Sequence, residues 1–413
     1  MKILAPYGYF APEHAASSYL WQNLHEDIAK EGIDCLVSVP LPTRGVSKEV
    51  RKEYKKRKRE TMYDGKLTIN RFWLWNEPNS SAMRFLRYFV QCAYQYCSYS
   101  FGRGQWDVIF AASTPPIIGA TCALIKKAKG MPFVYNLQDI FPDSLMGANI
   151  TQKKGLLWKI GRKLEDYTYR NADKIIVISE DFKKNIMAKG VPEEKIVVIY
   201  NWVDQNVVEN VPREENKLFD MYGLDRSKFY VTYNGNIGLS QNMEMLLSVA
   251  SELQGGMDDI HFVLVGNGAY LEEVKRMVND KGLQNVHLLP FQPYEDISHV
   301  FSLGDVSIVI SKPGTGAASV PSKTWSIMSA SRPVLANFDE NELKTIIEEN
   351  NCGIFTKAGD KEAFKAAILR LYGDRDLCKE LGRNGRKFVM ENLTREVGTQ
   401  KYVDVIKSVV CDK

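Results

Sequence analysis

Two series of short apolar runs, separated by amphipathic segments, constrain the fold of this chain more than any other feature of the sequence. The first series lies between residues 3 and 200, and the second lies between residues 229 and 336. A buried strand followed by a helix, repeated along a chain, is typical of a parallel β-sheet covered by helices on both faces. The chain has 413 residues, which is enough for two such domains. We therefore expect an α/β protein with two parallel sheets.

The expected strands are short, and helical patterns lie between many of them. In the first half we expect strands at residues 3–5, 36–39, 108–111, 133–135, 175–178 and 196–200, and helices at 17–30, 117–129, 157–170 and 181–189. In the second half we expect strands at residues 229–233, 262–265, 286–289, 305–310 and 333–336, and helices at 242–253, 271–281 and 297–303. Gly32, Gly130 and Gly190 follow three of these helices, where a left-handed C-terminal cap is common.

Composition and polarity set the expected domain boundaries. A hydrophobic content of 45% and a charged content of 25% are typical of a globular protein. The polar segment 204–217 has the character of a linker. We expect one domain at residues 1–205, a second at 206–388, and a helical segment at 389–413 that packs back on the first domain.

The charge of the chain is unevenly distributed. Residues 1–205 carry a formal charge of +9 and the remainder −5, which together give the net charge of +4. A basic N-terminal half indicates an anionic partner. Seven scattered cysteines without a CxxC pair support neither a disulfide framework nor a zinc site, so we expect a reducing cytoplasm. We expect neither a signal peptide nor a membrane-spanning helix, because no apolar run is long enough.

Three loops in the second half follow expected strands and carry the residue types that bind phosphate. The segment 319–335 (SVPSKTWSIMSASRPVL) places Ser322 and Lys323 between a strand and a helix. A helix N-terminus with a nearby cation favours an anion. Gly235 and Gly238 follow the first strand of this half, and Gly266 and Gly268 follow the second. Each glycine turn alone is often only a turn, but three loops on one edge of a parallel sheet predict a nucleotide site.

In the first half, polar residues follow two expected strands. Glu13 and His14 lie in the loop after the first strand, and Asp139 follows the strand at 133–135. Because the carboxyl ends of parallel strands share one edge, these residues are candidates for acceptor recognition and catalysis. The alternatives are an exposed loop histidine at position 14 and a helix-cap or turn role for Asp139.

A basic run from Arg44 to Glu60 precedes an aromatic region from Phe72 to Phe101. The run holds nine Lys or Arg residues against three Glu. Basic and aromatic side chains side by side suit the surface of an anionic membrane. Nucleic-acid binding uses the same ingredients, and a solvated helix beside a core helix is the plain structural alternative. We favour the membrane surface.

Seven segments together resemble the retaining nucleotide-sugar glycosyltransferases of family 4, which have the GT-B fold. The resemblance covers essentially the whole chain and is most similar to the polysaccharide-assembly branch that includes N-acetyl-fucosamine transferases. The segments are FAPEHAASSYL at 10–20, DVIFAASTPPIIGA at 107–120, FVYNLQDIFPDS at 133–144, the stretch 177–204, YNGNIGLSQNMEMLL at 233–247, LVGNGAYLEEV at 264–274, and VPSKTWSIMSASRPVLA at 320–336.

The resemblance implies two Rossmann-like domains facing a cleft, with a nucleotide-sugar donor held by the second. It implies that the diphosphate lies over Gly235, Asn236 and Gly238 and is bound by Ser322 and Lys323. It implies that Gly266, Gly268 and the Phe291-Gln292 turn border the nucleotide base, and Ser326 is a further candidate for donor binding. Glu13, His14 and Asp139 would face the acceptor and the anomeric carbon of the donor.

The implied activity is transfer of an N-acetylamino sugar from a UDP-sugar to a polyprenyl-linked saccharide, for capsule, exopolysaccharide or O-antigen. We expect no metal and no resident cofactor, and a peripheral position at the inner face of the cell membrane. Two departures from the family stand out. Ala318 and Ser326 occupy the positions of a common pair of glutamates, of which the second holds the ribose or the donor sugar. In addition, Leu239-Ser240-Gln241 replaces an arginine after the glycine loop. A nucleotide-sugar epimerase and an inactive donor-binding partner remain alternatives, and a nicotinamide-dependent oxidoreductase is disfavoured because no GxGxxG follows a first strand.

Overall fold

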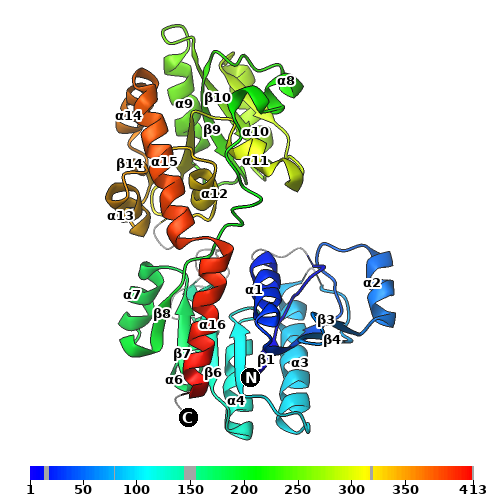
Figure 1. Cartoon of the computed structure of the whole chain (residues 1–413). Coiled ribbons are helices and arrows are strands. Elements are labelled where there is room, and N and C mark those ends of the chain that lie inside the picture. The colour runs from blue at the N-terminus through cyan, green and yellow to red at the C-terminus, as the bar shows by residue number, and fades with distance from the viewer. Residues whose placement is uncertain (14–17, 79, 144–154, 317–319, 412–413) are drawn as a thin grey trace. The chain divides into compact units, whose positions relative to one another are not determined.

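The computed structural model describes the whole chain except residues 14–17, 79, 144–154, 317–319 and 412–413. It divides into two compact units. The first contains Met1–Tyr200 together with Gly398–Lys413, and the second contains Asn201–Val397. Each unit has one sheet flanked by helices (Figure 1), which confirms the expected α/β class.

The first unit is built on an eight-stranded sheet in the order β3-β4-β2-β1-β5-β6-β7-β8. Its strands are β1 (Lys2–Pro6), β2 (Asp34–Pro40), β3 (Arg59–Met62), β4 (Leu67–Phe72), β5 (Val108–Ala112), β6 (Phe133–Leu137), β7 (Lys174–Val177) and β8 (Ile196–Val198). Its helices are α1 (Ser18–Lys30), α2 (Lys48–Lys56), α3 (Ser81–Ser100), α4 (Ile118–Lys129), α6 (Leu156–Asn171), α7 (Glu180–Ala188), the short η1 (Glu193–Lys195) and α16 (Arg395–Cys411).

The second unit has a six-stranded parallel sheet in the order β11-β10-β9-β12-β13-β14. Its strands are β9 (Phe229–Asn234), β10 (Ile260–Val265), β11 (Val286–Leu289), β12 (Val306–Ile310), β13 (Val334–Phe338) and β14 (Gly353–Lys357). Its helices are η2 (Arg213–Glu215), α8 (Leu218–Tyr222), α9 (Met243–Leu253), α10 (Leu271–Asp280), η3 (Tyr294–Asp296), α11 (Ile297–Phe301), α12 (Lys323–Ser329), α13 (Glu342–Glu349), α14 (Lys361–Gly373) and α15 (Arg375–Asn392).

Burial explains why the central strands are continuous apolar runs. Every residue of β5 and of β12 is buried, because helices cover both faces of a parallel sheet. Helix ends follow local chemistry. Ser179 caps α7 by accepting a hydrogen bond from Phe182 N, and Gly130 ends α4 in the left-handed conformation with φ of 68°.

The C-terminal helix α16 packs on the first unit, as expected. The Tyr402 ring meets the Phe110 ring of β5 edge-on, with centroids 5.9 Å apart. Lys407 also forms an ion pair with Glu31, at 2.8 Å. The chain thus leaves the first unit after β8 and returns to it at its end.

Three features differ from the sequence-based expectation. The hairpin of β3 and β4 and the edge strand β14 were not expected. In β4 the run is interrupted by Arg71, which is buried in an ion pair with Glu60. Residues 204–217 are not a free linker. Val208 is buried, and the backbone of this segment donates hydrogen bonds to Ser298 and Ser302 of the second unit.

Candidate functional site

The two units both present loops at the carboxyl ends of parallel strands, and the second unit has the order of a doubly wound sheet. β9 lies between β10 and β12. The chain therefore continues from β9 to β10 and β11 on one side, and then crosses to β12 on the other side of β9. The crevice at such a switch point is the usual ligand site of an open α/β sheet. The loops after β9, β10 and β12 are the three that the sequence singled out.

The two glycine loops lie side by side and are joined by their backbones. Gly235 N donates to Val265 O at 2.9 Å, and Ile237 N donates to Asn267 O at 2.9 Å. Tyr270 N donates back to Ile237 O at 3.0 Å. The sheet hydrogen bonding of β9 and β10 therefore continues into the loops, which fixes them as one surface.

Glycine is required here by close backbone approach. A Cβ atom on Gly266 would lie 1.9 Å from Gly235 O, and one on Gly268 would lie 2.2 Å from Ile237 O. Gly235 and Gly266 also have φ values of 126° and 156°, which L side chains rarely adopt. Any other residue at position 266 or 268 would push the two loops apart.

Lys323 reaches this glycine surface from the other side of the switch point. A Cβ atom on Gly235 would lie 3.2 Å from Lys323 Nζ, which itself lies 3.9 Å from the centre of the Tyr233 ring. Among the described residues no carboxylate pairs with this ammonium group. Burial without a counter-charge lowers the pKa of Lys323 to about 7. An anionic ligand would supply the missing partner.

The remaining predicted donor-site residues surround these loops. Ser322 is exposed at the start of α12 and makes no side-chain cap bond, and Ser326 is half-buried one turn later. Asn236 accepts a hydrogen bond from Tyr233 OH at its carbonyl, at 2.6 Å. Gln292 is buried, and its amide donates to Tyr222 OH and to Pro290 O, both at 2.7 Å. The neighbouring ring of Phe291 is 74% exposed.

Two further groups at this edge were missed by sequence reasoning. Glu244 Oε1 accepts from Tyr270 OH at 2.7 Å and from Lys312 Nζ at 2.9 Å, and its Oε2 is buried without a partner. Asp339 accepts hydrogen bonds from Gly314 N and Gly316 N and shapes the loop after β12. Lys312 and Asp339 both come one or two residues after a strand, and that position is the signal that could have found them.

In the first unit, two of the residues predicted to face the acceptor differ in burial: Glu13 is buried and Asp139 is exposed. Glu13 is buried and accepts hydrogen bonds at Oε1 from Thr43 N, at 2.7 Å, and from Arg44 N, at 3.0 Å. Asp139 is exposed after β6, and its backbone N–H donates to Ser113 Oγ at 3.2 Å. β5 separates their strands, so the two residues share an edge without a direct bond between them. His14 lies outside the described residues.

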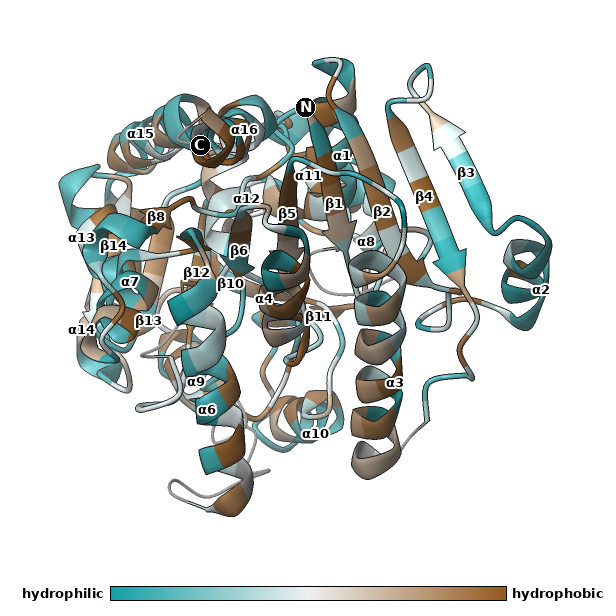
Figure 2. Ribbon diagram, turned by 90° about the horizontal axis from the view of Figure 1, so that it is seen from below, coloured by the Kyte–Doolittle hydropathy of each residue, from teal (hydrophilic) through white to brown (hydrophobic). Residues whose placement is uncertain are grey.

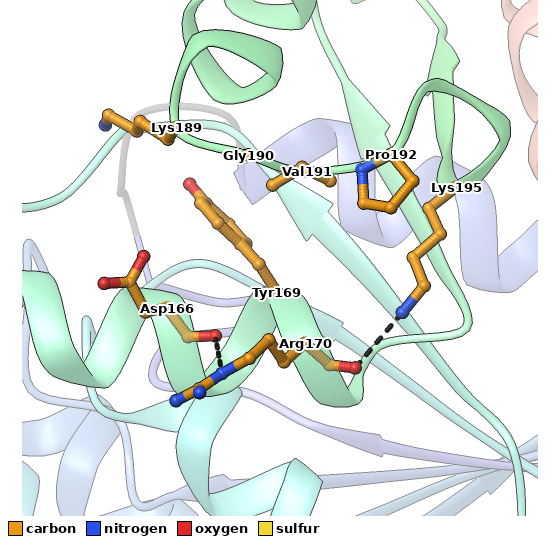
Figure 3. A pocket seen from close by; sticks show the side chains of 8 residues that line it. All are labelled: Asp166, Tyr169, Arg170, Lys189, Gly190, Val191, Pro192 and Lys195. Atoms are coloured by element: carbon orange, nitrogen blue, oxygen red, sulfur yellow. Dashed lines mark hydrogen bonds between the residues drawn. The ribbon is translucent and has the colours of Figure 1, made fainter.

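A cavity of about 470 Å³ lies elsewhere in the first unit, between the ends of α6 and α7 (Figure 3). Its cations are already engaged. Lys195 Nζ donates to Arg170 O at 3.1 Å, and Lys189 pairs with Asp143 at 2.8 Å. Helix C-termini carry partial negative charge, which disfavours a phosphate. This cavity is therefore not the predicted nucleotide site.

Within the described residues, no three or more His, Cys, Asp or Glu side chains gather in a way that could hold a metal ion. No helix in the described part of the chain is long and apolar enough to cross a membrane.

The chain was compared with known families and relatives. The family model "Glycosyl transferases group 1" matches residues 214–388, and "Glycosyltransferase Family 4" matches residues 20–207. The chain is 24% identical over 307 residues to the probable glycosyltransferase WbjE of Pseudomonas aeruginosa, covering 74% of this chain and 76% of that protein. It is 26% identical over 209 residues to the putative colanic acid biosynthesis glycosyl transferase WcaI of Escherichia coli K12, covering 50% and 51%.

Solved structures share the fold over nearly the full length. Anabaena Alr3699/HepE in complex with UDP superposes with a TM-score of 0.74 at 16% identity, covering 99% of this chain and 100% of that one. WaaG, a glycosyltransferase involved in lipopolysaccharide biosynthesis, superposes with a TM-score of 0.65 at 12% identity, covering 98% and 99%.

The doubly wound sheets and the full-length likeness define the GT-B fold. The chain is a glycosyltransferase, since two glycosyltransferase family models match its two halves.

Proposed function

We propose that this glycosyltransferase moves an N-acetylamino sugar from a UDP-sugar to a polyprenyl-linked saccharide, with retention of anomeric configuration, in polysaccharide assembly. The observation that carries the donor assignment is Lys323 Nζ, which lies beside the backbone of Gly235 without a carboxylate partner among the described residues. The UDP and UDP-glucose complexes solved for HepE support a nucleotide donor of this class.

In this proposal the second unit stabilises the leaving group. As the glycosidic bond breaks, negative charge grows on the departing diphosphate, and preorganised donors that meet this charge lower the barrier. Lys323 supplies the cation, Ser322 and Asn236 supply side-chain donors, and Gly235 and Gly238 let the backbone approach. The base lies beside Gly266 and Gly268, near Gln292, and Ser326 lies at the donor site without the glutamate that usually holds the ribose. No resident cofactor is part of the proposal, since the UDP-sugar is itself the substrate.

The acceptor hydroxyl is oriented by the first unit. We assign this role to Asp139 or Glu13, each in a loop after a strand of the first unit, and keep His14 as a third candidate from the sequence. Retention is explained by front-face attack, in which a donor phosphate oxygen takes the proton of the acceptor hydroxyl. A second carboxylate nucleophile, as in retaining glycosidases, is then unnecessary.

Helix α3 supports contact with a lipid surface, because its outer face is apolar. Met83, Leu86 and Phe89 are exposed by 46%, 48% and 62%, and Tyr94 continues the same face. Among the described residues of α3, the charged side chains are Arg84, which is 39% exposed and pairs with Glu77, and Arg87, which is buried. In Figure 2 much of α3 is coloured brown to grey, whereas α2 is mostly teal. A face of this kind is the apolar half of a membrane-surface site.

The basic half of the proposed membrane site is α2 and the residues after it. Lys52, Lys55 and Lys56 are exposed on α2, and Lys58 and Arg59 are exposed just beyond it. An anionic leaflet attracts such a cluster with about 1 kcal/mol per cation. If charge reversal of residues 55–59 leaves binding to vesicles of anionic lipid unchanged, the membrane proposal fails.

The donor proposal is tested by thermal shift with UDP, GDP, ADP, UDP-N-acetylglucosamine and NAD at equal concentration. UDP and its sugar should stabilise the chain, and the shift should be lost in Lys323→Ala. The product anomer, read by NMR after transfer to a polyprenyl-linked saccharide, tests retention. Stabilisation by NAD alone, or by none of the five compounds, would contradict the donor assignment.

A further inference from the structure

Helix α3 is inverted relative to an ordinary surface helix, because its polar residues face the core. Arg87, Gln91 and Gln95 recur every four residues and are fully buried. Gln91 Nε2 donates to Tyr7 O at 2.9 Å, and Gln95 Nε2 donates to Ser38 O at 3.0 Å. The two glutamines therefore satisfy backbone carbonyls near the ends of β1 and β2. Arg87 lies one turn earlier, but most of its N–H groups donate to no backbone carbonyl among the described residues.

The Arg87 guanidinium is buried with unused hydrogen-bonding capacity. Its Nε donates to Trp75 O at 3.1 Å. Its Nη1 and Nη2 atoms are buried and have no hydrogen-bond partner among the described residues. A buried guanidinium that lacks a counter-ion is costly, so such a group calls for a ligand that is absent from the protein alone.

Glu13 faces Arg87 but does not pair with it. Glu13 Oε1 is taken by the N–H groups of Thr43 and Arg44, while Oε2 is buried without a partner. Burial raises the pKa of Glu13, and the positive charge of Arg87 opposes that rise. The two groups therefore lie within electrostatic reach of each other, and both have buried polar atoms without a hydrogen-bond partner among the described residues.

The surrounding charges leave an excess of cations. We define the arginine cluster as five arginines and three glutamates: Arg44, Arg51, Arg71, Arg84, Arg87, Glu13, Glu60 and Glu77. Arg44 and Arg84 share Glu77, Arg71 pairs with Glu60, and Arg51 is satisfied by the carbonyls of residues 41, 42 and 74. The side chains of Arg44 and Arg84 are 37% and 39% exposed, whereas Arg51, Arg71 and Arg87 are buried.

We propose that the arginine cluster binds the diphosphate of the acceptor, with Arg87 as its buried anchor. The proposal rests on the lipid-linked acceptor proposed above and names the part of that acceptor that the first unit recognises. A planar guanidinium offers two parallel N–H donors that match the spacing of two phosphate oxygens. In Arg87 the donors on Nη1 and Nη2 are unused among the described residues. The apolar face of the same helix would then contact the lipid that carries the diphosphate.

The test is thermal unfolding of the full-length chain in saturating UDP, with and without sodium pyrophosphate. UDP fills the donor site, so pyrophosphate is left with the arginine cluster. Pyrophosphate should raise the Tm of the wild type, and this shift should be lost in Arg87→Met. The matched control is Arg103→Met, because Arg103 is exposed in the same unit. No shift in the wild type, or an equal shift in Arg87→Met, would overturn the proposal.

Folding of the variants separates a ligand site from an internal ion pair. Removing an unpaired buried charge in favour of an apolar chain should leave Tm unchanged or raise it. Arg87→Met could instead lower Tm by more than about 5 °C, with Glu13→Gln restoring Tm in the double variant. That result would show that Arg87 neutralises Glu13 inside the protein, and it would overturn the proposal. If Arg87→Met does not fold, Arg87→Lys carries the test, and it should weaken pyrophosphate binding about tenfold. Unchanged affinity in Arg87→Lys would overturn it.

Farnesyl diphosphate in the same titration distinguishes a lipid-borne diphosphate from a free one. It should bind more tightly than pyrophosphate and should lose this advantage in Phe89→Glu, while equal affinity would overturn the acceptor assignment. The donor proposal is tested separately by Lys323→Ala. That variant should lose the UDP shift and keep the pyrophosphate shift that depends on Arg87, so the two proposals can fail independently.

Discussion

The donor edge of the second unit, which is the loops after β9, β10 and β12 with Lys323, and the arginine cluster of the first unit would recognise anions by opposite means if both proposals hold. The donor edge is built from backbone, since Gly235, Gly266 and Gly268 pack without side chains and a single lysine adds charge. The arginine cluster is built from long side chains, and the backbone of the first unit contributes mainly acceptors for them. A backbone surface fixes where a diphosphate lies, whereas a side-chain cluster can be varied to suit different acceptors. We therefore propose that the second unit carries the common chemistry of the reaction and that the first unit carries its specificity.

The largest expected effect is on turnover and tests Lys323, the lysine of the donor edge that has no carboxylate partner among the described residues. Lys323→Ala should lower turnover about 10²–10³-fold, as the loss of a preorganised donor to a developing anion does. The control is Lys281→Ala, because Lys281 is exposed in the same unit. Turnover is measured by UDP release with acceptor present. Near-normal turnover in Lys323→Ala would remove the lysine from the donor edge and break the contrast between the two regions.

The next effect tests the backbone character of the donor edge. In Gly266→Ala the new Cβ would lie 1.9 Å from Gly235 O, at a φ of 156°. We expect a loss of about 3 kcal/mol in the free energy of unfolding, together with loss of the UDP-induced Tm shift. Gly256→Ala is the control, since nothing lies within 4 Å of a Cβ there. Urea unfolding and thermal shift measure both effects, and equal behaviour of the two variants would refute the packing argument.

The pH dependence of UDP binding tests the electrostatics of Lys323. Burial lowers its pKa to about 7, and a bound diphosphate should restore it toward the ordinary value. Above pH 7 the free protein loses a proton that the complex retains, so UDP affinity should fall by up to tenfold per pH unit. In Lys323→Arg the guanidinium stays charged, and affinity should remain flat from pH 7 to 9. A wild-type profile as flat as that of Lys323→Arg would contradict the lowered pKa.

The smallest expected effect concerns the apolar face of α3. Phe89→Glu should weaken partition onto vesicles of anionic lipid about tenfold, because one aromatic contact of one to two kcal/mol is lost. Stability should change by less than about 0.5 kcal/mol, since Phe89 is 62% exposed. Leu124→Glu is the matched control on α4, where Leu124 is 43% exposed. Co-sedimentation measures both, and an equal loss in the two variants would show that charge alone drives binding.

Much of the fold could be predicted because buried parallel strands are short apolar runs that are easy to recognise in the sequence. The run at residues 108–111 is apolar throughout, the run at 305–310 is mostly so, and Gly130 caps the helix that follows the first of them. The hairpin of β3 and β4 was not predicted, because Arg71 interrupts the apolar pattern of β4 and is buried by pairing with Glu60. β14 escaped because it is an edge strand whose burial is only partial.

The donor edge was predictable to a similar degree, and the arginine cluster was not. A glycine after a strand signals close backbone approach at positions that local sequence defines, as at Gly235 and Gly266. In α3, periodicity shows that Arg87, Gln91 and Gln95 share a face, but a polar face is ordinarily the outer one. Their inward placement depends on the carbonyls of Tyr7 and Ser38, which come from distant parts of the sequence and require donors.

The most direct test of the central claim is a crystal structure of the chain with UDP. The diphosphate should lie over Gly235–Gly238, with an oxygen about 2.7–3.2 Å from Lys323 Nζ. The base should lie beside Gly266 and Gly268. A diphosphate bound away from Lys323, or UDP held by the first unit, would contradict the assignment of the donor edge.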